Sequence, residues 1–147
     1  MQIDLHGKSI LLGVTGSISA YKACDIARLF VKAGAQVHVV MTVSAERFVS
    51  ALTFEALTRN SVLTEESESW STELNHIDMG KKCDVFIVAH ATANTLNKMS
   101  QGFADNILTQ TFLAFQGDIL LAPAANTQML AHPSSMKSLN LLKEYGY

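Results

Sequence analysis

The stretch Val85-Phe86-Ile87-Val88-Ala89-His90-Ala91-Thr92-Ala93-Asn94-Thr95 decides the fold of this chain. Residues 85–89 form an unbroken apolar run, which is typical of a strand buried on both faces of a parallel sheet. Small and polar residues, two threonines and an asparagine among them, follow directly. Ligands of open α/β sheets bind just beyond the carboxyl ends of the strands. The stretch therefore predicts a buried strand that ends at a ligand site, although an ordinary helix start capped by threonine or asparagine has the same pattern.

Further apolar runs on both sides of this stretch predict more strands. They cover residues 10–14, 36–41 and 119–122, and Pro123 ends the last one. Their alternation with helical patterns predicts an α/β chain with a Rossmann-like (flavodoxin-like) architecture, a three-layer sandwich around a parallel sheet. The expected helices cover residues 18–33, 42–57 with a break near Leu52-Thr53, 93–100, 105–115 and 134–145. A short strand at 61–64, an exposed acidic loop at 65–73 and a short helix at 78–82 complete the expectation. Ser17 or Thr15, Asp105 and Ser134 are the expected caps of the helices that start at residues 18, 105 and 134.

Composition limits the kinds of protein that this chain can be. With 147 residues, 48% of them hydrophobic and 16% charged, residues 1–147 are expected to fold as one domain. A formal net charge of −2 offers no basic surface to nucleic acid, and no apolar run approaches the ~20 residues of a membrane span. Cys24 and Cys83 have no further Cys or His at zinc-ligand spacing. Neither a disulfide framework nor a metal site is expected, and a reducing cytoplasm fits best.

The turn after the first predicted strand, Gly13-Val14-Thr15-Gly16-Ser17-Ile18-Ser19, has the composition of a phosphate site. Glycine permits close backbone approach, and the start of the next helix offers free N–H groups and a positive dipole end. The turn has neither a Walker loop nor the Gly-x-Gly-x-x-Gly dinucleotide spacing, so a mononucleotide phosphate fits better than a pyrophosphate. Thr42 and Ser44, after the next strand, are expected to reach the same phosphate. A tight turn without a ligand and simple helix capping by Thr42 or Ser44 are the alternatives.

Two polar residues elsewhere are candidates for roles in chemistry. Asn126 follows the last predicted strand, and its amide can hold a carboxylate without adding a competing charge; an Asx turn is the alternative. His76 lies in the polar segment before the strand at residue 85. A lone histidine is more often structural than catalytic, so this residue has both interpretations. Asp78 either orients His76 or caps a helix.

Four motifs in the right order resemble the homo-oligomeric flavin-containing cysteine decarboxylase family, over nearly the whole chain. The family's Pro-Ala-Ser/Thr-Ala-Asn-Thr motif corresponds to His90-Ala91-Thr92-Ala93-Asn94-Thr95, and its Pro-Ala-Met-Asn-x-x-Met motif corresponds to Pro123-Ala124-Ala125-Asn126-Thr127-Gln128-Met129. Its His-Ile pair is His76-Ile77, and its Gly-Ser-Ile turn is Gly16-Ser17-Ile18. This chain departs from the family at His90, which replaces a proline, and at Ala125, which replaces a methionine.

The resemblance implies a site for FMN, which supplies the difficult chemistry while the protein orients it. His76 is the implied acid/base, Asn126 would hold the substrate carboxylate, and Met129 would form a wall of the site. The resemblance also implies a homotrimer or an assembly of trimers with the flavin near subunit contacts. The phosphate would bind to Gly16, Ser17, Ile18 and Ser19 with help from Thr42 or Ser44, and the ring would lie against Ala91, Thr92, Ala93, Asn94 and Thr95, with Phe54 as a neighbour.

The implied reaction is decarboxylation of 4′-phosphopantothenoylcysteine to 4′-phosphopantetheine in coenzyme A biosynthesis. Oxidation of the cysteine thiol to a thioaldehyde creates a C=S group that can accept electrons as CO₂ leaves. A peptidyl-cysteine decarboxylase and a non-catalytic flavin-binding regulatory subunit are the alternatives. Family members of the coenzyme A pathway continue into a flap and a cysteine-containing segment, and the domain here is expected to end before both, at Gly146-Tyr147.

Overall fold

The structure, a computed structural model, describes residues 3–147 and is organised around one sheet of four parallel strands. The strand order is β2-β1-β3-β4, so the chain crosses over the sheet between successive strands. Register is continuous between β1 and β2, from the Ser9–Gln36 pair to the Val14–Met41 pair. The strands are β1 (Ser9–Val14), β2 (Gln36–Met41), β3 (Val85–Ala91) and β4 (Asp118–Pro123).

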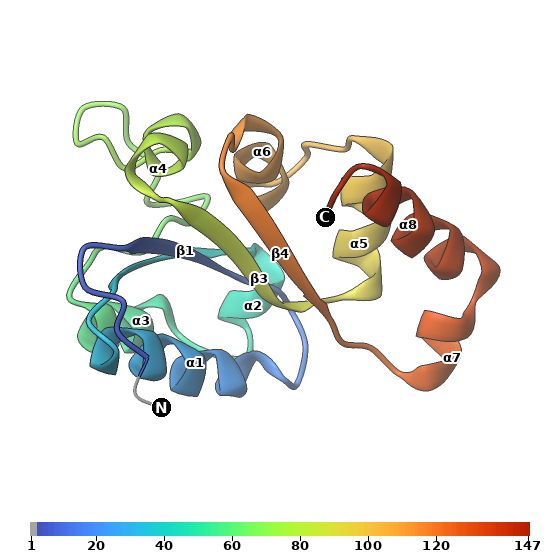
Figure 1. Ribbon diagram of the computed structural model, residues 1–147, viewed down its shortest axis with the longest axis horizontal. Helices are drawn as coiled ribbons and strands as arrows, with labels where there is room; N and C mark the ends of the chain where they lie inside the picture. Colours follow the sequence, from blue (N-terminus) through green and yellow to red (C-terminus); the bar gives the residue numbers. More distant parts are fainter. Residues whose placement is uncertain (1–2) are drawn as a thin grey trace.

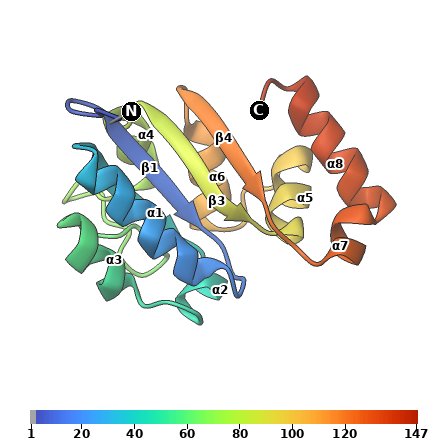
Figure 2. The ribbon, with the colours of Figure 1, turned by 60° about the horizontal axis from the view of Figure 1, so that its bottom comes forward.

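Helices cover both faces of the sheet and confirm the predicted α/β sandwich. Figures 1 and 2 show α1 and α3 on one face, α4, α5 and α6 on the other, and α8 packed outside α5. The helices are α1 (Ala20–Lys32), α2 (Val43–Glu46), α3 (Ala51–Thr58), α4 (His76–Lys82), α5 (Ala93–Gln101), α6 (Ile107–Ala114), α7 (Thr127–Ala131) and α8 (Pro133–Glu144).

Two apolar cores lie on the two faces of the sheet, and β1 contributes to both. Leu12 packs with α1 and α3, whereas Leu11 packs with α4, α5 and α6 on the opposite face. The ring of Phe86, on the neighbouring strand β3, packs against β1 at Gly13. A Cβ at this position would be only 2.9 Å from that ring. The glycine in the first strand is therefore required by packing.

Several predicted boundaries and caps are wrong, and local hydrogen bonds explain the differences. Thr15 does not cap α1, because its hydroxyl contacts β3 instead, and Ser19 is the N-cap residue without a side-chain cap bond. Asn106, not Asp105, caps α6, since the Asp105 carboxylate pairs with Lys98. His132 rather than Ser134 caps α8.

The segment that follows β2 also differs from the expected outline. The helical region breaks at residues 47–50, between α2 and α3, and not at Leu52-Thr53, which lie inside α3. The expected strand at 61–64 is reduced to a single parallel bridge between Leu63 and Val40. Pro123 is the last residue of β4, and the short helix α7 after it was not expected. No helix among residues 3–147 has both the length and the apolar character needed to cross a membrane.

Candidate flavin and substrate site

A cavity of about 910 Å³ opens at the carboxyl edge of the sheet, where the sequence predicts a ligand site. This volume is at the upper end of the range typical of small-molecule sites. The segments after all four strands contribute to its wall. The lining residues are Gly16, Ser17, Ile18, Ser19, Thr42, Val43, Ser44, Thr92, Ala93, Asn94, Thr95, Lys98, Asn106, Pro123, Ala124, Ala125, Asn126, Met129 and Leu130.

Gly16 brings the turn after β1 into direct contact with the turn after β2. A Cβ at this position would be 2.4 Å from the Cβ of Ser44 and 2.9 Å from its carbonyl carbon. Only glycine permits this approach without moving the backbone. The contact brings the turn that carries Ser17 and Ser19 next to Thr42 and Ser44, and all four residues line the cavity.

This end of the cavity has the donors that a phosphate needs. The N–H groups of Gly16 and Ile18 have no hydrogen-bond acceptor among the residues that the structure describes, and α1 begins beside them. The side-chain oxygen of Thr42 caps α2 by accepting from the N–H of Ala45 at 3.1 Å. Thr42 therefore caps a helix and also lines the cavity. Among residues 3–147, Lys98 is the one charged residue that lines the cavity, and no carboxylate of these residues does.

Thr15 joins the end of β3 to the turn after β1. Its hydroxyl donates to the carbonyl of His90 at 2.5 Å and accepts from the N–H of Thr92 at 3.2 Å. Thr92 in turn caps α5 by accepting from the N–H of Thr95 at 3.2 Å. The capping interpretation of the threonine is thus confirmed, and the cap itself lines the cavity.

Asn126 and Met129 form the wall of the cavity that follows β4. The Asn126 oxygen caps α7 by accepting from the N–H of Gln128 at 2.9 Å. Because that bond occupies the carbonyl oxygen, the amide NH₂ stays available to an acidic group of a ligand. The Asx interpretation and the binding interpretation of Asn126 are therefore compatible.

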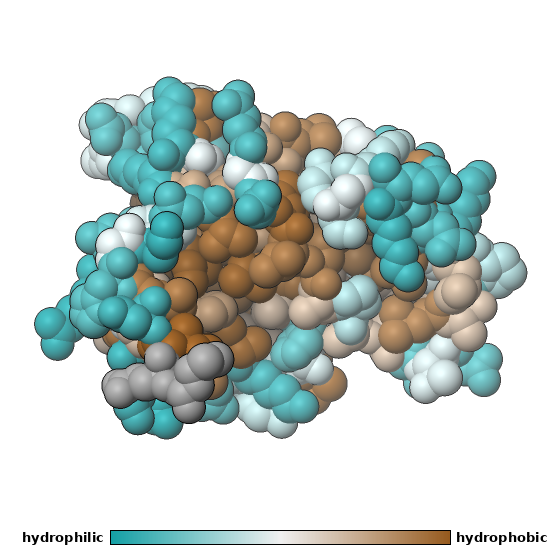
Figure 3. All heavy atoms as spheres, viewed as in Figure 1, coloured by the Kyte–Doolittle hydropathy of each residue, from teal (hydrophilic) through white to brown (hydrophobic). Residues whose placement is uncertain are grey.

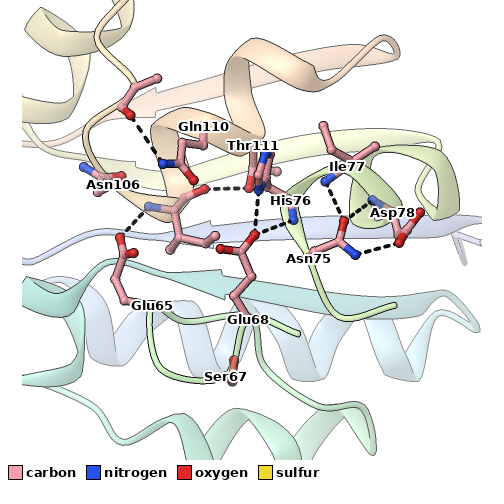
Figure 4. A network of polar contacts seen from close by, with 12 residues as sticks. Glu65, Ser67, Glu68, Asn75, His76, Ile77, Asp78, Asn106, Gln110 and Thr111 are labelled. Atoms are coloured by element: carbon pink, nitrogen blue, oxygen red, sulfur yellow. Dashed lines mark hydrogen bonds and ion pairs between the residues drawn. The ribbon is translucent and has the colours of Figure 1, made fainter. Parts of the chain in front are cut away.

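His76 lies in a different region, at the first residue of α4, and does not line the cavity. Both ribbon views place α4 on the opposite side of the molecule from α7. The His76 Nδ1 lies 2.6 Å from Glu68 Oε1 (Figure 4). The Trp70 ring meets the imidazole edge-on at a centroid distance of 5.6 Å. Asp78 does not orient His76, because its carboxylate accepts from the Asn75 amide at 2.6 Å.

Two more predicted flavin neighbours, Phe54 and Ala91, lie outside the lining. Phe54 of α3 is fully buried in the core on the α1 face of the sheet, and Ala91 is fully buried in the core on the opposite face. Conversely, the structure adds Lys98 and Asn106 to the lining. Lys98 lies one helical turn after Asn94 on α5, so the i, i+4 spacing could have identified it as a second residue on the cavity side of this helix.

Neither cysteine belongs to this site. Burial, together with the neighbouring Asp84 charge, raises the pKa of the Cys83 thiol to about 12. Burial and the Asp25 charge also raise the pKa of Cys24. Both thiols therefore remain protonated near neutral pH, a state in which cysteine is a poor nucleophile.

Comparison with known proteins shows that the chain belongs to the Flavoprotein family, whose model matches residues 2–147. It is 44% identical over 144 residues to the coenzyme A biosynthesis bifunctional protein CoaBC of Bacillus subtilis, covering 97% of this chain and 36% of that protein. It is 41% identical over 143 residues to the probable phosphopantothenoylcysteine decarboxylase of Streptococcus mutans, covering 95% of this chain and 80% of that protein. The chain thus spans about a third of the length of the bifunctional relative and most of the length of the second one.

A solved structure agrees with the sequence relatives. The FMN-dependent cysteine decarboxylase TvaF from thioviridamide biosynthesis superposes with a TM-score of 0.89 at 33% identity, covering 96% of this chain and 88% of that chain. The family and the flavodoxin-like fold predicted from the motifs are therefore confirmed.

Proposed function

We propose that this protein is an FMN-dependent decarboxylase that converts 4′-phosphopantothenoylcysteine to 4′-phosphopantetheine in coenzyme A biosynthesis. The observation that carries the proposal is the cavity at the carboxyl edge of the sheet, where Gly16, Thr92 and Asn126 meet. All three belong to motifs shared with the flavin-containing cysteine decarboxylases. The 41% identity to a probable phosphopantothenoylcysteine decarboxylase, over 80% of its length, favours this substrate over a peptide.

The residues present fit FMN. Ser17, Ser19 and the free N–H groups of Gly16 and Ile18 would hold the phosphate, without any carboxylate in the lining to repel it. The small side chains of Ala93 and Asn94 leave a wall that a flat ring can approach.

The reaction needs an electron acceptor, a carboxylate anchor and a proton carrier. Bound FMN would supply the two-electron oxidation of the cysteine thiol, which leaves a C=S group next to the carbon that carries the carboxylate. The Asn126 NH₂ would hold that carboxylate until CO₂ leaves and its electrons move into the C=S group. The ene-thiol that remains would regain two electrons and two protons through the reduced cofactor and solvent, so the overall conversion to 4′-phosphopantetheine is redox neutral. His76 would take up the thiol proton, because an imidazole has a nitrogen lone pair that can act as a general base.

A second copy of the chain would bring His76 to the cavity, because one chain holds His76 and Asn126 in separate regions. Ile18, Val43 and Met129, all at the cavity, expose more than half of their surface. Figure 3 shows further apolar side chains over the middle of the sheet, where Leu120 of β4 is 56% exposed. Such surfaces are typical of protein contacts. We propose a homotrimer or an assembly of trimers, in the reducing cytoplasm where a free-thiol substrate persists.

The first test is the visible absorption spectrum of the purified protein with mass identification of any released yellow ligand. FMN is the expected ligand, and a colourless protein that cannot be reconstituted with FMN would refute the proposal. The second test measures CO₂ release from 4′-phosphopantothenoylcysteine and from a peptide that ends in cysteine. Faster release from the peptide would reassign the substrate, and flavin binding without CO₂ from either would indicate a non-catalytic subunit.

A further inference from the structure

We infer that Glu68 is a positioning residue for His76: its carboxylate holds Nδ1 and leaves Nε2 as the nitrogen that exchanges protons with substrate. The inference rests on the proposed function and adds a residue that the sequence motifs do not contain. Glu68 lies in the acidic segment that composition alone assigns to an exposed loop.

The contact between the two side chains is short and partly shielded from water. Glu68 Oε1 lies 2.6 Å from His76 Nδ1 and also accepts from the backbone N–H of His76 at 3.4 Å. The two side chains are only 23% and 21% exposed. A hydrogen bond from an imidazole N–H to a carboxylate is stronger in a partly buried site than on an open surface. The Trp70 ring meets the edge of the imidazole at an interplanar angle of 81° and covers part of it.

The loop that carries Glu68 is itself anchored, so the carboxylate has a defined place. Glu65 accepts from the backbone N–H of Ile107 at 2.6 Å and so ties the loop to the start of α6. The hydroxyl of Ser67 donates to the carbonyl of Val62 at 2.6 Å. Figure 4 shows Glu65 directed toward α6 while Glu68 is directed toward the histidine ring. The loop is therefore bound to α6 through Glu65 and to α4 through Glu68.

The chemical consequence is a choice between the two ring nitrogens. A carboxylate only accepts hydrogen bonds, so Nδ1 must carry the proton in this contact. In the neutral ring, Nε2 is then the nitrogen with the free lone pair. Nε2 has no hydrogen-bond partner among residues 3–147, so it is free to take a proton from a thiol. The arrangement repeats the logic by which a buried carboxylate sets the tautomer of a catalytic histidine.

The experiment compares wild-type holoprotein with Glu68→Ala, Glu68→Gln and, as a matched control, Glu66→Ala, which removes an exposed carboxylate of the same loop. Imidazole ¹⁵N shifts of ¹⁵N-histidine protein report the tautomer, and the His76→Asn variant assigns the signal. We expect the Nδ1–H form in wild type and in the control, and a shift toward the Nε2–H form in Glu68→Ala. We also expect kcat for CO₂ release to fall about 10- to 100-fold with little change in KM, the usual cost of losing a group that orients a histidine.

Glu68→Gln keeps the size of the side chain, so it serves if Glu68→Ala does not fold. Its amide can donate to Nδ1 as well as accept, and the Nε2–H form should therefore appear and kcat should lie between those of wild type and Glu68→Ala. An unchanged tautomer, or a changed tautomer with unchanged kcat, overturns the inference. If His76→Asn abolishes turnover while Glu68→Ala does not reduce it, the inference fails and the proposed function stands. A wild-type protein that releases no CO₂ refutes the proposed function and, with it, the positioning role of Glu68 in that reaction.

Discussion

The cavity and the His76 region are built in different ways. The cavity is formed by turns that follow four strands, and its geometry depends on backbone contacts such as that between Gly16 and Ser44. The His76 region depends on side chains from separate segments, with Glu68 holding the ring and Glu65 holding the loop to α6. One chain therefore forms the cavity by itself, whereas under the proposed function His76 reaches a cavity only from a second copy. The following predictions test this division.

The largest effect is expected from mixing two inactive variants. His76→Asn and Asn126→Ala should each lower CO₂ release by about 100-fold or more, because each removes a group from every site. If the two residues act across a subunit contact, oligomers refolded from an equal mixture should recover about one quarter of wild-type activity, since random assembly restores both groups in that share of sites. Turnover by the mixture is compared with turnover by each variant refolded alone. No recovery would mean that both residues act within one chain.

Gly16→Ala should disrupt the cavity and leave the His76 region intact. The new methyl group would meet the backbone of Ser44, and overpacking of this kind costs about 1–3 kcal/mol of unfolding free energy. FMN content and the denaturation midpoint should both fall. Gly80→Ala in α4 is the matched control, because the nearest heavy atom to its Cβ would be 3.7 Å away. Equal FMN content in the two variants would contradict the role of Gly16.

Asn126→Asp separates the cap of α7 from the binding of the carboxylate. Aspartate keeps an oxygen to accept from Gln128 but places a negative charge beside the substrate carboxylate. We expect KM to rise about 10- to 100-fold, the cost of losing a hydrogen bond to a charged group. The thermal midpoint should stay near that of wild type. Steady-state kinetics measure the first effect and calorimetry the second, and an unchanged KM would exclude contact between Asn126 and the carboxylate.

The smallest effect concerns His38 on β2, outside both regions. Burial, assisted by the Lys82 charge, lowers the pKa of His38 below its ordinary value of 6.5. The unfolded chain therefore binds this proton more readily, and folded-state stability is lost as the pH falls through 6.5 toward the folded-state pKa. His38→Gln should reduce the drop in thermal midpoint between about pH 8 and pH 5.5 by a few degrees at most. An identical drop in thermal midpoint in wild type and His38→Gln would show that His38 does not contribute to this pH dependence.

The sequence predicts the strands and the cavity well because both depend on local pattern. The apolar run at residues 85–89 becomes the centre of the sheet, and the segments that follow the strands contribute to the cavity wall in the expected way. Helix caps are harder to predict because neighbouring polar residues compete for other partners. Asp105 is engaged by Lys98 and Thr15 is engaged by β3, which leaves Asn106 and Ser19 at the N-cap positions.

The partner of His76 could not be predicted from spacing. Asp78 is two residues away in the sequence, but the amide of Asn75 binds it, whereas Glu68 reaches the ring from eight residues upstream. That approach depends on the loop being folded back by the antiparallel bridge between Ser69 and Leu74. Phe54 is a different case: the family resemblance implies it as a flavin neighbour, but the packing of α3 buries it in the core.

The separation of the cavity from the Glu68–His76 pair has a practical consequence for purification and screening. Yellow colour would report only that the strand-end turns have folded and loaded their ligand. Under the proposed function, a damaged loop at Glu68, or dilution that dissociates the proposed assembly, would leave a fraction with full colour and no turnover. Under the proposed function, specific activity per bound flavin, measured over a range of protein concentrations, is therefore a better measure of intact protein than absorbance.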